Sequence, residues 1–274
     1  MMAFLGLVRR APVVAVVRLA GLVGPPLPFR AGISIAGLAG PLERAFSLRN
    51  LKAVALAINS PGGSAVQSAL IAKRIRDLAA ERNVPVLAFA EDVAASGGYW
   101  LACAADEIWA DESTILGSIG VISAGFGFSE LLRRLGIERR VHVAGERKGM
   151  LDPFRAESGE DVARLTSLQQ DIHVSFRRHV RARRGARLKG DDATLFNGDV
   201  WTGQRALDLG LIDGIGDLRS VMRARFGDKV RFRTVGAGGG WLRRRLRPAS
   251  EPGDWTRDLL SAIEERAWWA RYGL

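Results

Sequence analysis

Short apolar runs alternate with helical periodicity along the first part of the chain. Residues 13–19, 53–58 and 85–90 are almost continuously apolar, which is typical of strands buried on both faces of a parallel sheet. Ser64 stands at a helix N-cap position. The apolar residues after it recur at helical spacing, namely Val66, Leu70, Ile71, Ile75 and Leu78. Strand, helix and strand in this order predict an α/β fold with a parallel sheet and right-handed crossovers.

The same reasoning extends the prediction to most of the chain. It indicates short strands at 107–110 and 140–144, and helices at 41–49, 99–105, 129–135 and 159–184. Residues 24–40 are rich in Gly and Pro, which predicts a loop with one short strand. We expect one domain over residues 1–235, followed over 236–274 by a Gly-rich linker and a C-terminal amphipathic helix.

Composition and charge leave several classes of partner open. The 274 residues are 47% hydrophobic and 25% charged, with a formal net charge of +11. Basic residues gather in 177–189 and 219–247, and Asp228 is the single acid in those two stretches. Such stretches attract nucleic acid, anionic lipid or acidic proteins, but they are more often a solvated surface. We adopt the solvated surface and do not expect nucleic acid as a partner.

The cysteine and histidine content and the N-terminal sequence argue against disulfides, metal sites and a membrane-spanning helix. One cysteine, Cys103, forms neither an internal disulfide nor a cysteine-built metal site, and the three histidines lack a paired ligand motif. We therefore expect no metal and no cofactor. Arg9, Arg10 and Arg18 interrupt the apolar start, which is too short between charges for a membrane span of about 20 residues. We expect a cytoplasmic protein, with peripheral contact at the inner membrane as the alternative.

Two small-residue loops follow predicted strands, where ligands gather in parallel α/β sheets. Residues 59–64 (NSPGGS) place two glycines before a helix, so that backbone N–H groups are accessible to an oxyanion; a plain tight turn is the alternative. Residues 94–98 (AASGG) surround one hydroxyl, that of Ser96, at a strand-to-helix turn. This arrangement resembles a nucleophile elbow without its G-x-S-x-G pattern, and a helix-capping serine is the alternative.

A nucleophilic serine needs a base. His142 lies inside a predicted strand, whereas His173 and His179 fall on a basic helix and are predicted to be surface residues. Lys148 follows a predicted strand in a chain that is otherwise rich in Arg. A lysine acts as a base near neutral pH when burial or a nearby cation lowers its pKa, so Lys148 is the candidate base.

The motifs together resemble the signal peptide peptidase A family of bacterial serine proteases, which share the Clp/crotonase-like fold. The resemblance covers roughly residues 13–218. It rests on the order and spacing of NSPGG at 59–63, AASGGY at 94–99, AADEI at 104–108, LGSIGV at 116–121, Lys148 with DPFR at 152–155, GDVWTG at 198–203 and ALDLGLID at 206–213.

The resemblance implies a role for each candidate residue. Ser96 would attack the scissile carbonyl, and Lys148 would accept its proton and pass it to the leaving amine. The N–H groups of Gly63 and Gly97 would form the oxyanion hole, and the hydroxyl of Ser118 would orient the lysine. The family is homo-oligomeric, and in half-length members, which this chain resembles, the serine and the lysine come from neighbouring protomers. Peptides are the implied substrates, in particular short apolar ones such as cleaved signal peptides.

Several points depart from the family pattern or stay open. We expect no N-terminal anchor of the kind that many members carry, and Arg147 stands where a tyrosine often precedes the lysine. The Trp-rich tail suits a second protomer or a membrane surface. We favour the protomer, because Glu264 and Glu265 dilute the positive charge. The rival functions are a crotonase-type enzyme acting on an acyl-CoA and a non-catalytic basic scaffold.

Overall fold

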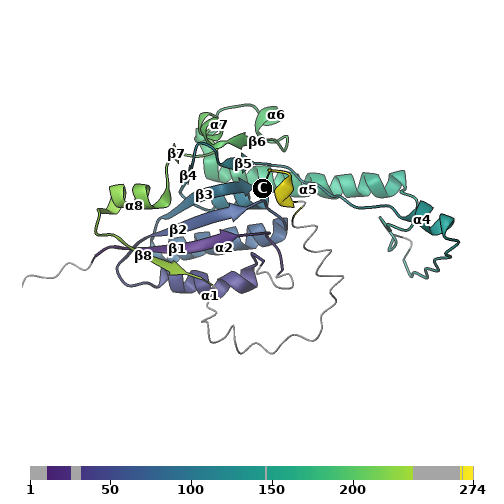
Figure 1. Ribbon diagram of the computed structural model, residues 1–274, viewed down its shortest axis with the longest axis horizontal. Helices are drawn as coiled ribbons and strands as arrows, with labels where there is room; N and C mark the ends of the chain where they lie inside the picture. The colour runs from purple at the N-terminus through teal and green to yellow at the C-terminus, as the bar shows by residue number, and fades with distance from the viewer. Residues whose placement is uncertain (1–10, 26–31, 146, 237–265, 267, 274) are drawn as a thin grey trace, which may run out of the picture.

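The computed structural model describes residues 11–25, 32–145, 147–236, 266 and 268–273. Its centre is an eight-stranded sheet in the order β6-β5-β3-β2-β1-β8, with β4 pairing with β3 and β7 (Figure 1). The strands are β1 (Val13–Ala20), β2 (Leu51–Ser60), β3 (Val86–Ala95), β4 (Glu107–Ala110), β5 (Ile115–Gly117), β6 (Val200–Thr202), β7 (Gly214–Ile215) and β8 (Arg231–Val235). All pairs are parallel except β5 with β6, so the predicted α/β class with a mainly parallel sheet is confirmed.

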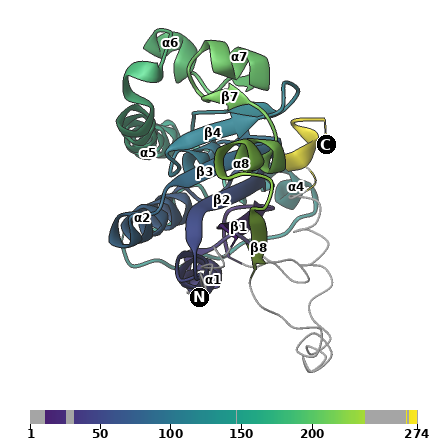
Figure 2. The same ribbon diagram turned by 90° about the vertical axis from the view of Figure 1, so that its left-hand side faces the viewer.

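Helices cover both faces of the sheet, and alternation along the strands explains why. In β1, Ala15, Val17 and Leu19 belong to the larger buried cluster, whereas Val14 belongs to the smaller one on the other face. The larger cluster packs against α1 (Ile35–Phe46), α2 (Ala65–Arg82), α3 (Gly97–Ala102) and α5 (Gly159–Arg184). The smaller cluster packs against α8 (Leu218–Phe226), which lies on the opposite face from α1 and α2 (Figure 2). Because the central strands are buried on both faces, their sequences are nearly continuous apolar runs.

Helix α1 differs from its prediction. A helix was expected over 41–49, but α1 begins at Ile35, with Ser34 accepting the N–H of Gly37 as the N-cap, and it continues through Pro41. Gly37, Gly40 and Pro41 are helix-breaking residues in local terms, which is why the pattern predicts a loop there. Burial of Leu38, Pro41, Leu42, Ala45 and Phe46 against the sheet outweighs that local cost.

The predicted strand at 140–144 is wrong. Those residues are exposed and have no strand assignment, because no neighbouring strand within the described chain offers them a ladder. They belong to a projecting segment, residues 121–158, which we call the arm. The arm contains α4 (Ser129–Arg134) and lies along the outer half of α5, away from the sheet (Figure 1). Its described residues are almost all exposed or half-buried.

The remaining described elements attach the inner end of α5 to the sheet. They are the short helices η1 (Gly185–Arg187), α6 (Asp192–Leu195) and α7 (Gly203–Asp208). Arg177 and Arg181 pair with Asp192, so α6 is held to α5 by charge. The expected linker and C-terminal helix lie mostly in residues 237–265, outside the described residues. Within the described ranges, no helix combines the length and the apolarity needed to cross a membrane.

Candidate active site

Two loops meet where adjacent parallel strands end. Ser60, the last residue of β2, pairs with Ala94 near the end of β3. The chain leaves β2 through Gly62 and Gly63 into α2, whose N-cap is Ser64, and it leaves β3 through Ser96 into α3. The two loops identified from the sequence therefore lie side by side at one edge of the sheet, as the rule for parallel α/β sheets predicts.

Ser96 has an uncommon backbone conformation. Its φ is 51° and its ψ is −120°, a region that residues with a side chain rarely occupy. It stands at the N-cap position of α3, yet its hydroxyl accepts no capping N–H. The hydroxyls of Ser34 and Ser64, by contrast, accept N–H groups of α1 and α2. The alternative of a helix-capping serine therefore does not describe Ser96, whose half-buried side chain is available for other chemistry.

Glycines surround Ser96 because other residues would collide there. A Cβ on Gly62 would lie 2.7 Å from the Cβ of Ser96, and one on Gly98 would lie 2.4 Å from the carbonyl oxygen of Ser60. A Cβ on Gly97 would lie 2.6 Å from the Oγ of Ser68. The sharp turn of the chain at Ser96 thus depends on close backbone approach, as in a nucleophile elbow.

Two backbone N–H groups converge beside the serine. The Gly97 nitrogen lies 2.8 Å from where a Cβ on Gly62 would be, and the Gly63 nitrogen lies 3.3 Å from where a Cβ on Gly97 would be. Gly63, Ser96 and Gly97 line one cleft. The Val23 N–H donates to the Gly62 oxygen, and the Val23 oxygen accepts the Ser64 N–H. The Gly63 N–H, which lies between these two bonds, is not used by Val23. Neither the Gly63 nor the Gly97 N–H donates a bond to another described residue. Paired free donors of this kind suit an oxyanion.

Ser118 lies directly beside the nucleophile loop. Strand β5 ends at Gly117, which pairs with Ala95, and the Gly117 oxygen accepts the Ser96 N–H at 2.8 Å. Ser118 also has a positive φ, 51°, and its N–H donates to the Asp199 oxygen at 2.6 Å. Ser96 and Ser118 therefore follow the ends of the paired strands β3 and β5. The hydrogen bond from the Ser96 N–H to Gly117, the residue before Ser118, links the two loops.

A cleft of about 210 Å³ opens beside Ser96. Ser96, Gly63 and Gly97 supply its polar edge. Its other lining residues are mainly apolar and come from α2, α3, α5, the start of the arm and the tail, namely Ala65, Trp100, Gly120, Val121, Ile122, Ile172, Phe176 and Trp268. A small number of polar groups in an apolar concavity is typical of a ligand site.

A larger groove, about 910 Å³, lies on the sheet face next to α8. Phe89 and Phe232 contribute to it, and its charged groups already have partners: Arg18 pairs with Glu91 at 2.8 Å, and Asp217 caps α8. This groove lacks the free amide pair and the strained serine, so we assign the chemistry to the smaller cleft. Across the described residues, no group of three His, Cys, Asp or Glu side chains is placed to hold a metal.

The inner half of α5 supports the short helix behind Ser96. Trp100 of α3 stacks on Phe176 at 4.7 Å and on His179 at 5.2 Å between ring centroids. The His179 ring bonds the Trp100 carbonyl, and the His173 ring bonds the Ile119 carbonyl beside Ser118, each at 3.1 Å. The prediction that both histidines are surface residues is therefore wrong: both are half-buried and hold the two serine loops. Burial lowers the pKa of His179 from 6.5 to about 4, which keeps its ring neutral.

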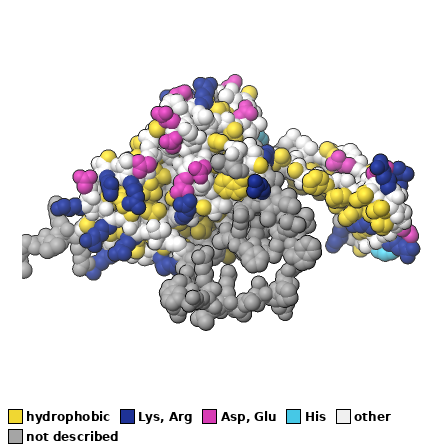
Figure 3. Space-filling model, in the orientation of Figure 1, with side chains coloured by type: hydrophobic (Ala, Val, Ile, Leu, Met, Phe, Trp, Pro, Cys, Tyr) yellow, Lys and Arg dark blue, Asp and Glu magenta, His cyan; other side chains and the backbone are white. Residues whose placement is uncertain are grey.

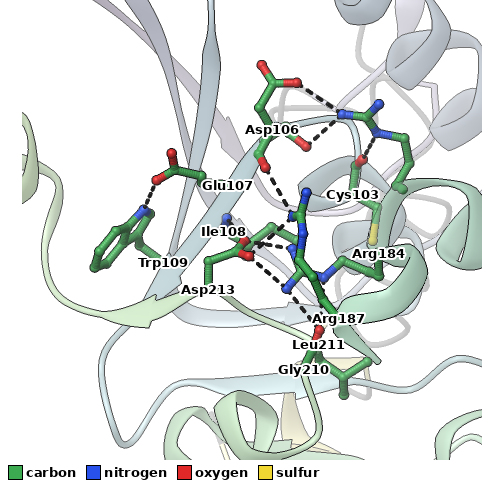
Figure 4. Close-up of polar contacts among 12 residues, drawn as sticks. Cys103, Asp106, Glu107, Ile108, Trp109, Arg184, Arg187, Gly210, Leu211 and Asp213 are labelled. Atoms are coloured by element: carbon green, nitrogen blue, oxygen red, sulfur yellow. Dashed lines mark hydrogen bonds and ion pairs between the residues drawn. The ribbon is translucent and has the colours of Figure 1, made fainter. Parts of the chain in front are cut away.

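A buried ion pair fixes the same end of α5 (Figure 4). The Arg184 guanidinium is almost fully buried and lies 2.6 Å from the Asp213 carboxylate, and it also donates to the Gly210 carbonyl. Burial alone would raise the pKa of Asp213, but the hydrogen bonds from Arg184 and the Ile108 N–H, together with the charges of Arg184 and Arg187, lower that pKa. Arg183 and Arg187 reach Asp106 and Asp213. In the basic stretch at 177–189, Arg178, Arg181, Arg187 and Lys189 are exposed, as expected of a solvated surface, whereas Arg184 is buried and paired.

The lone cysteine plays no part in the cleft. Cys103 is fully buried, and desolvation raises its pKa to about 12. Tyr99, one turn earlier in α3, is also fully buried and donates its hydroxyl hydrogen to the Leu211 carbonyl at 2.7 Å. Both side chains are buried in the core at α3, so Ser96 is the candidate nucleophile among the residues that line the cleft.

Lys148 does not meet Ser96 within one chain. It is exposed on the arm and does not line the cleft. Its neighbour Arg147 lies 3.9 Å from Glu160, at the outer end of α5, whereas Ile172 of the same helix lines the cleft. At about 1.5 Å per residue, Glu160 and Ile172 are about 18 Å apart along the helix axis. A proton transfer between the two side chains requires contact at about 3 Å.

Comparison with known proteins identifies the family. A profile described as Peptidase family S49 matches residues 79–228, more than half of the chain, including the nucleophile loop and the arm. The chain belongs to peptidase family S49. The resemblance to the signal peptide peptidase A family, inferred from the motifs around Ser96 and Ser118, is thereby confirmed.

Curated relatives of this S49 family member are longer than it is. A protein named Na(+)/H(+) antiporter NhaA from Brucella abortus is 50% identical over 274 aligned positions, covering 95% of this chain and 37% of the relative. A putative signal peptide peptidase SppA from Enterococcus faecium is 34% identical over 168, covering 61% and 48%. A mutant of the 1510-N membrane-bound stomatin-specific protease shares 15% identity at a TM-score of 0.47, over 84% of this chain and 95% of that one. The chain thus spans between a third and a half of the length of these two curated relatives.

Some features of the site had no signal in the sequence. The stack of Trp100, Phe176 and His179 joins residues far apart in the chain, and nothing in their local pattern connects them. The position of Trp268 in the same cleft as Ser96 has no sequence signal either, because the Trp-rich tail predicts contact with a second protomer or a membrane surface. The roles given to Ser96, Lys148, Ser118, Gly63 and Gly97 stay predictions, which the next subsection develops.

Proposed function

We propose that this S49 family member is a serine endopeptidase, with Ser96 as nucleophile and Lys148 as general base. The observation that carries the proposal is the strained, uncapped Ser96 beside the free N–H groups of Gly63 and Gly97. A hydroxyl held at a sharp turn next to two convergent donors is what acyl transfer requires, because attack at a carbonyl creates an oxyanion next to the attacking oxygen.

The reaction follows from these groups in two stages. The neutral amine of Lys148 takes the Ser96 proton as Oγ bonds to the scissile carbonyl carbon, and the Gly63 and Gly97 N–H groups donate to the resulting oxyanion. The C–N bond then breaks, and the lysine ammonium gives its proton to the leaving amine, which leaves an ester on Ser96. Water, deprotonated by the same lysine, hydrolyses that ester and restores both residues. Ser118, beside the nucleophile loop, would orient the amine by a hydrogen bond.

A second copy of this chain supplies the base in this proposal. Within one chain, Lys148 is exposed on the arm and its neighbour contacts the outer end of α5. The arm also exposes large apolar side chains that a monomer leaves in water (Figure 3). They include Phe126, at 82% exposure, with Phe128, Leu131, Leu135, Ile137, Val141 and Val143. A contiguous exposed apolar surface of this kind marks an interaction site. We infer that the arm packs on a neighbouring protomer and carries Lys148 to that protomer's Ser96.

Apolar peptides are the proposed substrates. The cleft walls from Val121, Ile122 and Phe176 suit an apolar side chain, and a peptide extended along the strand ends would place its carbonyl over the two N–H groups. One relative is named a putative signal peptide peptidase, which makes remnants of cleaved signal peptides the leading candidates. We propose a cytoplasmic location, with peripheral contact at the inner membrane as the site of substrate encounter.

Transport and nucleic-acid binding are not proposed. The antiporter name belongs to a protein of which this chain covers 37%, so that name describes a much longer molecule. Arg177, Arg181, Arg183, Arg184 and Arg187 are all paired with acids of the same chain, which reduces the attraction of the 177–189 stretch for a polyanion.

The direct test is cleavage of a panel of apolar fluorogenic peptides together with labelling by a fluorophosphonate probe. We expect the wild type to cleave, and Ser96→Ala and Lys148→Ala each to lose at least about a thousandfold in rate while remaining folded and assembled. Lys73→Ala is the matched control, because Lys73 is an exposed lysine paired with Asp77 on α2, and it should retain full activity.

Each other outcome contradicts a defined part of the proposal. Full activity in Lys148→Ala would remove the lysine from its role as base. A folded wild type that neither cleaves nor reacts with the probe would refute the peptidase. Hydrolysis of an acyl-CoA thioester that survives Ser96→Ala would support the crotonase-type rival instead.

A further inference from the structure

Trp268 of the chain's own tail lies at the cleft that contains Ser96. It lines the same 210 Å³ space as Ser96, Gly63 and Gly97, together with apolar side chains of α5. The described part of the tail, Arg266 and residues 268–273, includes a short helical segment, drawn in yellow in Figure 1, and its Trp268 shares the cleft lining with Ile172 and Phe176 of α5. The side chain that borders the nucleophile therefore comes from a position more than 170 residues further along the chain.

The contact between this tail segment and the cleft is apolar. Among the described residues, the segment's hydrogen bonds are internal, from the Tyr272 N–H to the Trp269 oxygen and from the Gly273 N–H to the Ala270 oxygen. The Arg271 guanidinium lies over the Trp268 ring at 5.3 Å, which is also a contact within the segment. No ion pair or hydrogen bond among the described residues ties it to the domain. Such a contact releases without leaving a buried polar group unpaired.

The space left beside Trp268 is too small for a peptide substrate. Pockets that bury a drug-sized ligand measure about 300–1,000 Å³, and an extended peptide of several residues needs at least as much room. The cleft has about 210 Å³ while Trp268 forms one of its walls. An indole is also the kind of group that the stacked Trp100 and Phe176 rings and the Ile172 side chain would bind.

We propose that Trp268 is an autoinhibitory occupant of the substrate cleft, which must leave before an apolar peptide binds across Ser96. The inference rests on the proposed function and adds a regulatory step to it. Because Trp268 belongs to the same chain as the cleft, its effective concentration there is on the order of millimolar. A contact with an intrinsic dissociation constant of about 0.1 mM would then be occupied about 90% of the time. Substrate affinity falls by the fraction of open clefts, which is about tenfold.

Occupancy is tested without catalysis, by quenching of a fluorophore next to the cleft. Val66, which follows Ala65 of the cleft lining and is 66% exposed, is replaced by cysteine and labelled with bimane, which tryptophan quenches on contact. Native Cys103 is buried and does not compete for the label. We expect Trp268→Ala to raise bimane emission, and the matched Trp269→Ala, at a neighbour that does not line the cleft, to leave it unchanged. Equal emission in all three proteins would overturn the placement.

Inhibition is tested by the rate at which a fluorophosphonate labels Ser96 in the full-length chain. Trp268→Ala should label about ten times faster than the wild type and show a lower KM with kcat unchanged, whereas Trp269→Ala should match the wild type. Size-exclusion chromatography confirms that the three proteins assemble alike. Equal or slower labelling of Trp268→Ala would overturn the inference, the latter by showing that Trp268 completes the substrate pocket.

The two measurements separate the two proposals. If bimane emission rises in Trp268→Ala but Ser96 reacts in no protein, the proposed peptidase fails while Trp268 is still shown to occupy the cleft, and its inhibitory role falls with the activity. If Ser96 reacts equally in every protein, the peptidase stands and autoinhibition fails.

Discussion

The sheet and the arm contribute to the site in opposite ways. The sheet buries its strands on both faces and holds Ser96 in a strained conformation between glycines that tolerate no side chain. The arm, residues 121–158, is mostly exposed, and its apolar groups have few partners besides the rings of Phe126, Phe128 and Phe154. The sheet is thus packed within the single chain, whereas the arm leaves its apolar side chains exposed.

In our proposal this difference explains how the catalytic groups are divided. The proposed nucleophile and oxyanion donors need precise positions, and they lie at strand ends fixed by packing. The proposed base would come from a neighbouring protomer, and its long side chain would adjust when it meets Ser118. A single chain would then build the half of the site that demands preorganisation.

The strongest test of this division mixes two inactive proteins. Ser96→Ala keeps an intact Lys148, and Lys148→Ala keeps an intact Ser96. If the dyad crosses protomers, mixed assemblies contain some complete sites. We expect activity to rise from a background of about a thousandth to a substantial fraction of wild type after subunit exchange.

The control is each variant mixed with itself, which should stay inactive. A mixture of the two variants that remains inactive, although mass spectrometry shows mixed oligomers, would place both residues in one chain and remove the distinction between sheet and arm.

The next effect concerns the end of α5 that is embedded in the core. Asp213→Ala leaves the buried Arg184 guanidinium without its carboxylate. Breaking a buried ion pair in this way costs about 3–5 kcal/mol. Urea unfolding should show that loss, whereas Asp208→Ala, which removes an exposed carboxylate of α7, should lie within about 0.5 kcal/mol of wild type. The double variant Arg184→Leu with Asp213→Leu should recover part of the loss. A small change in the free energy of unfolding of Asp213→Ala would contradict the claim that this ion pair fixes the buried end of α5.

The two regions should also respond differently to acid. The pKa of His179 is about 4 in the folded chain and 6.5 when unfolded, so the unfolded state takes up the proton first as the pH falls. Stability from this residue is therefore intact above pH 6.5 and declines as the pH falls to 4, by about 3 kcal/mol in total. His179→Gln should flatten that part of the urea-derived stability profile. His142→Gln makes the same substitution on the exposed arm and serves as the control for the substitution itself.

The smallest effect on folding is expected on the arm. Phe126 is 82% exposed, so Phe126→Ser should change the free energy of unfolding of the monomer by less than about 0.5 kcal/mol. The same change should weaken assembly, measured by sedimentation velocity over a concentration series, and should lower activity in parallel. In the core, Phe176→Ala should cost about 3–5 kcal/mol. Unaltered assembly in Phe126→Ser would assign the apolar arm another partner.

Local patterns in the sequence predicted much of the fold and part of the site. The predictions of strands around residues 13–19, 53–58 and 85–90 are confirmed, because short continuous apolar runs are typical of buried strands. The predicted bounds of the helix at 159–184 match those of α5. Of the apolar positions assigned to α2, Ile71, Ile75 and Leu78 are buried, but Val66 and Leu70 are exposed. The loops of Gly63 and Ser96 were found because strand ends and glycines leave a local signature.

The errors have a common cause. Helix α1 runs through Pro41 because of tertiary burial, and the described chain offers the 140–144 segment no partner strand. His173 and His179 turn inward to the carbonyls of Ile119 and Trp100, which are far away in the sequence. Each depends on contacts between remote parts of the chain, which local periodicity does not contain. The position of Lys148 relative to Ser96 is the extreme case, because in our proposal it depends on another molecule.

The separation of about 18 Å along α5 between the contact of Arg147 and the cleft has a kinetic consequence. If the base always comes from a neighbour, a newly synthesised chain is inert until it meets other copies. At high dilution, the rate of cleavage should then rise more steeply than in proportion to the total protein concentration. It should become proportional to that concentration once assembly is complete. Proteolysis would be switched on by abundance, without a propeptide or an activating ligand.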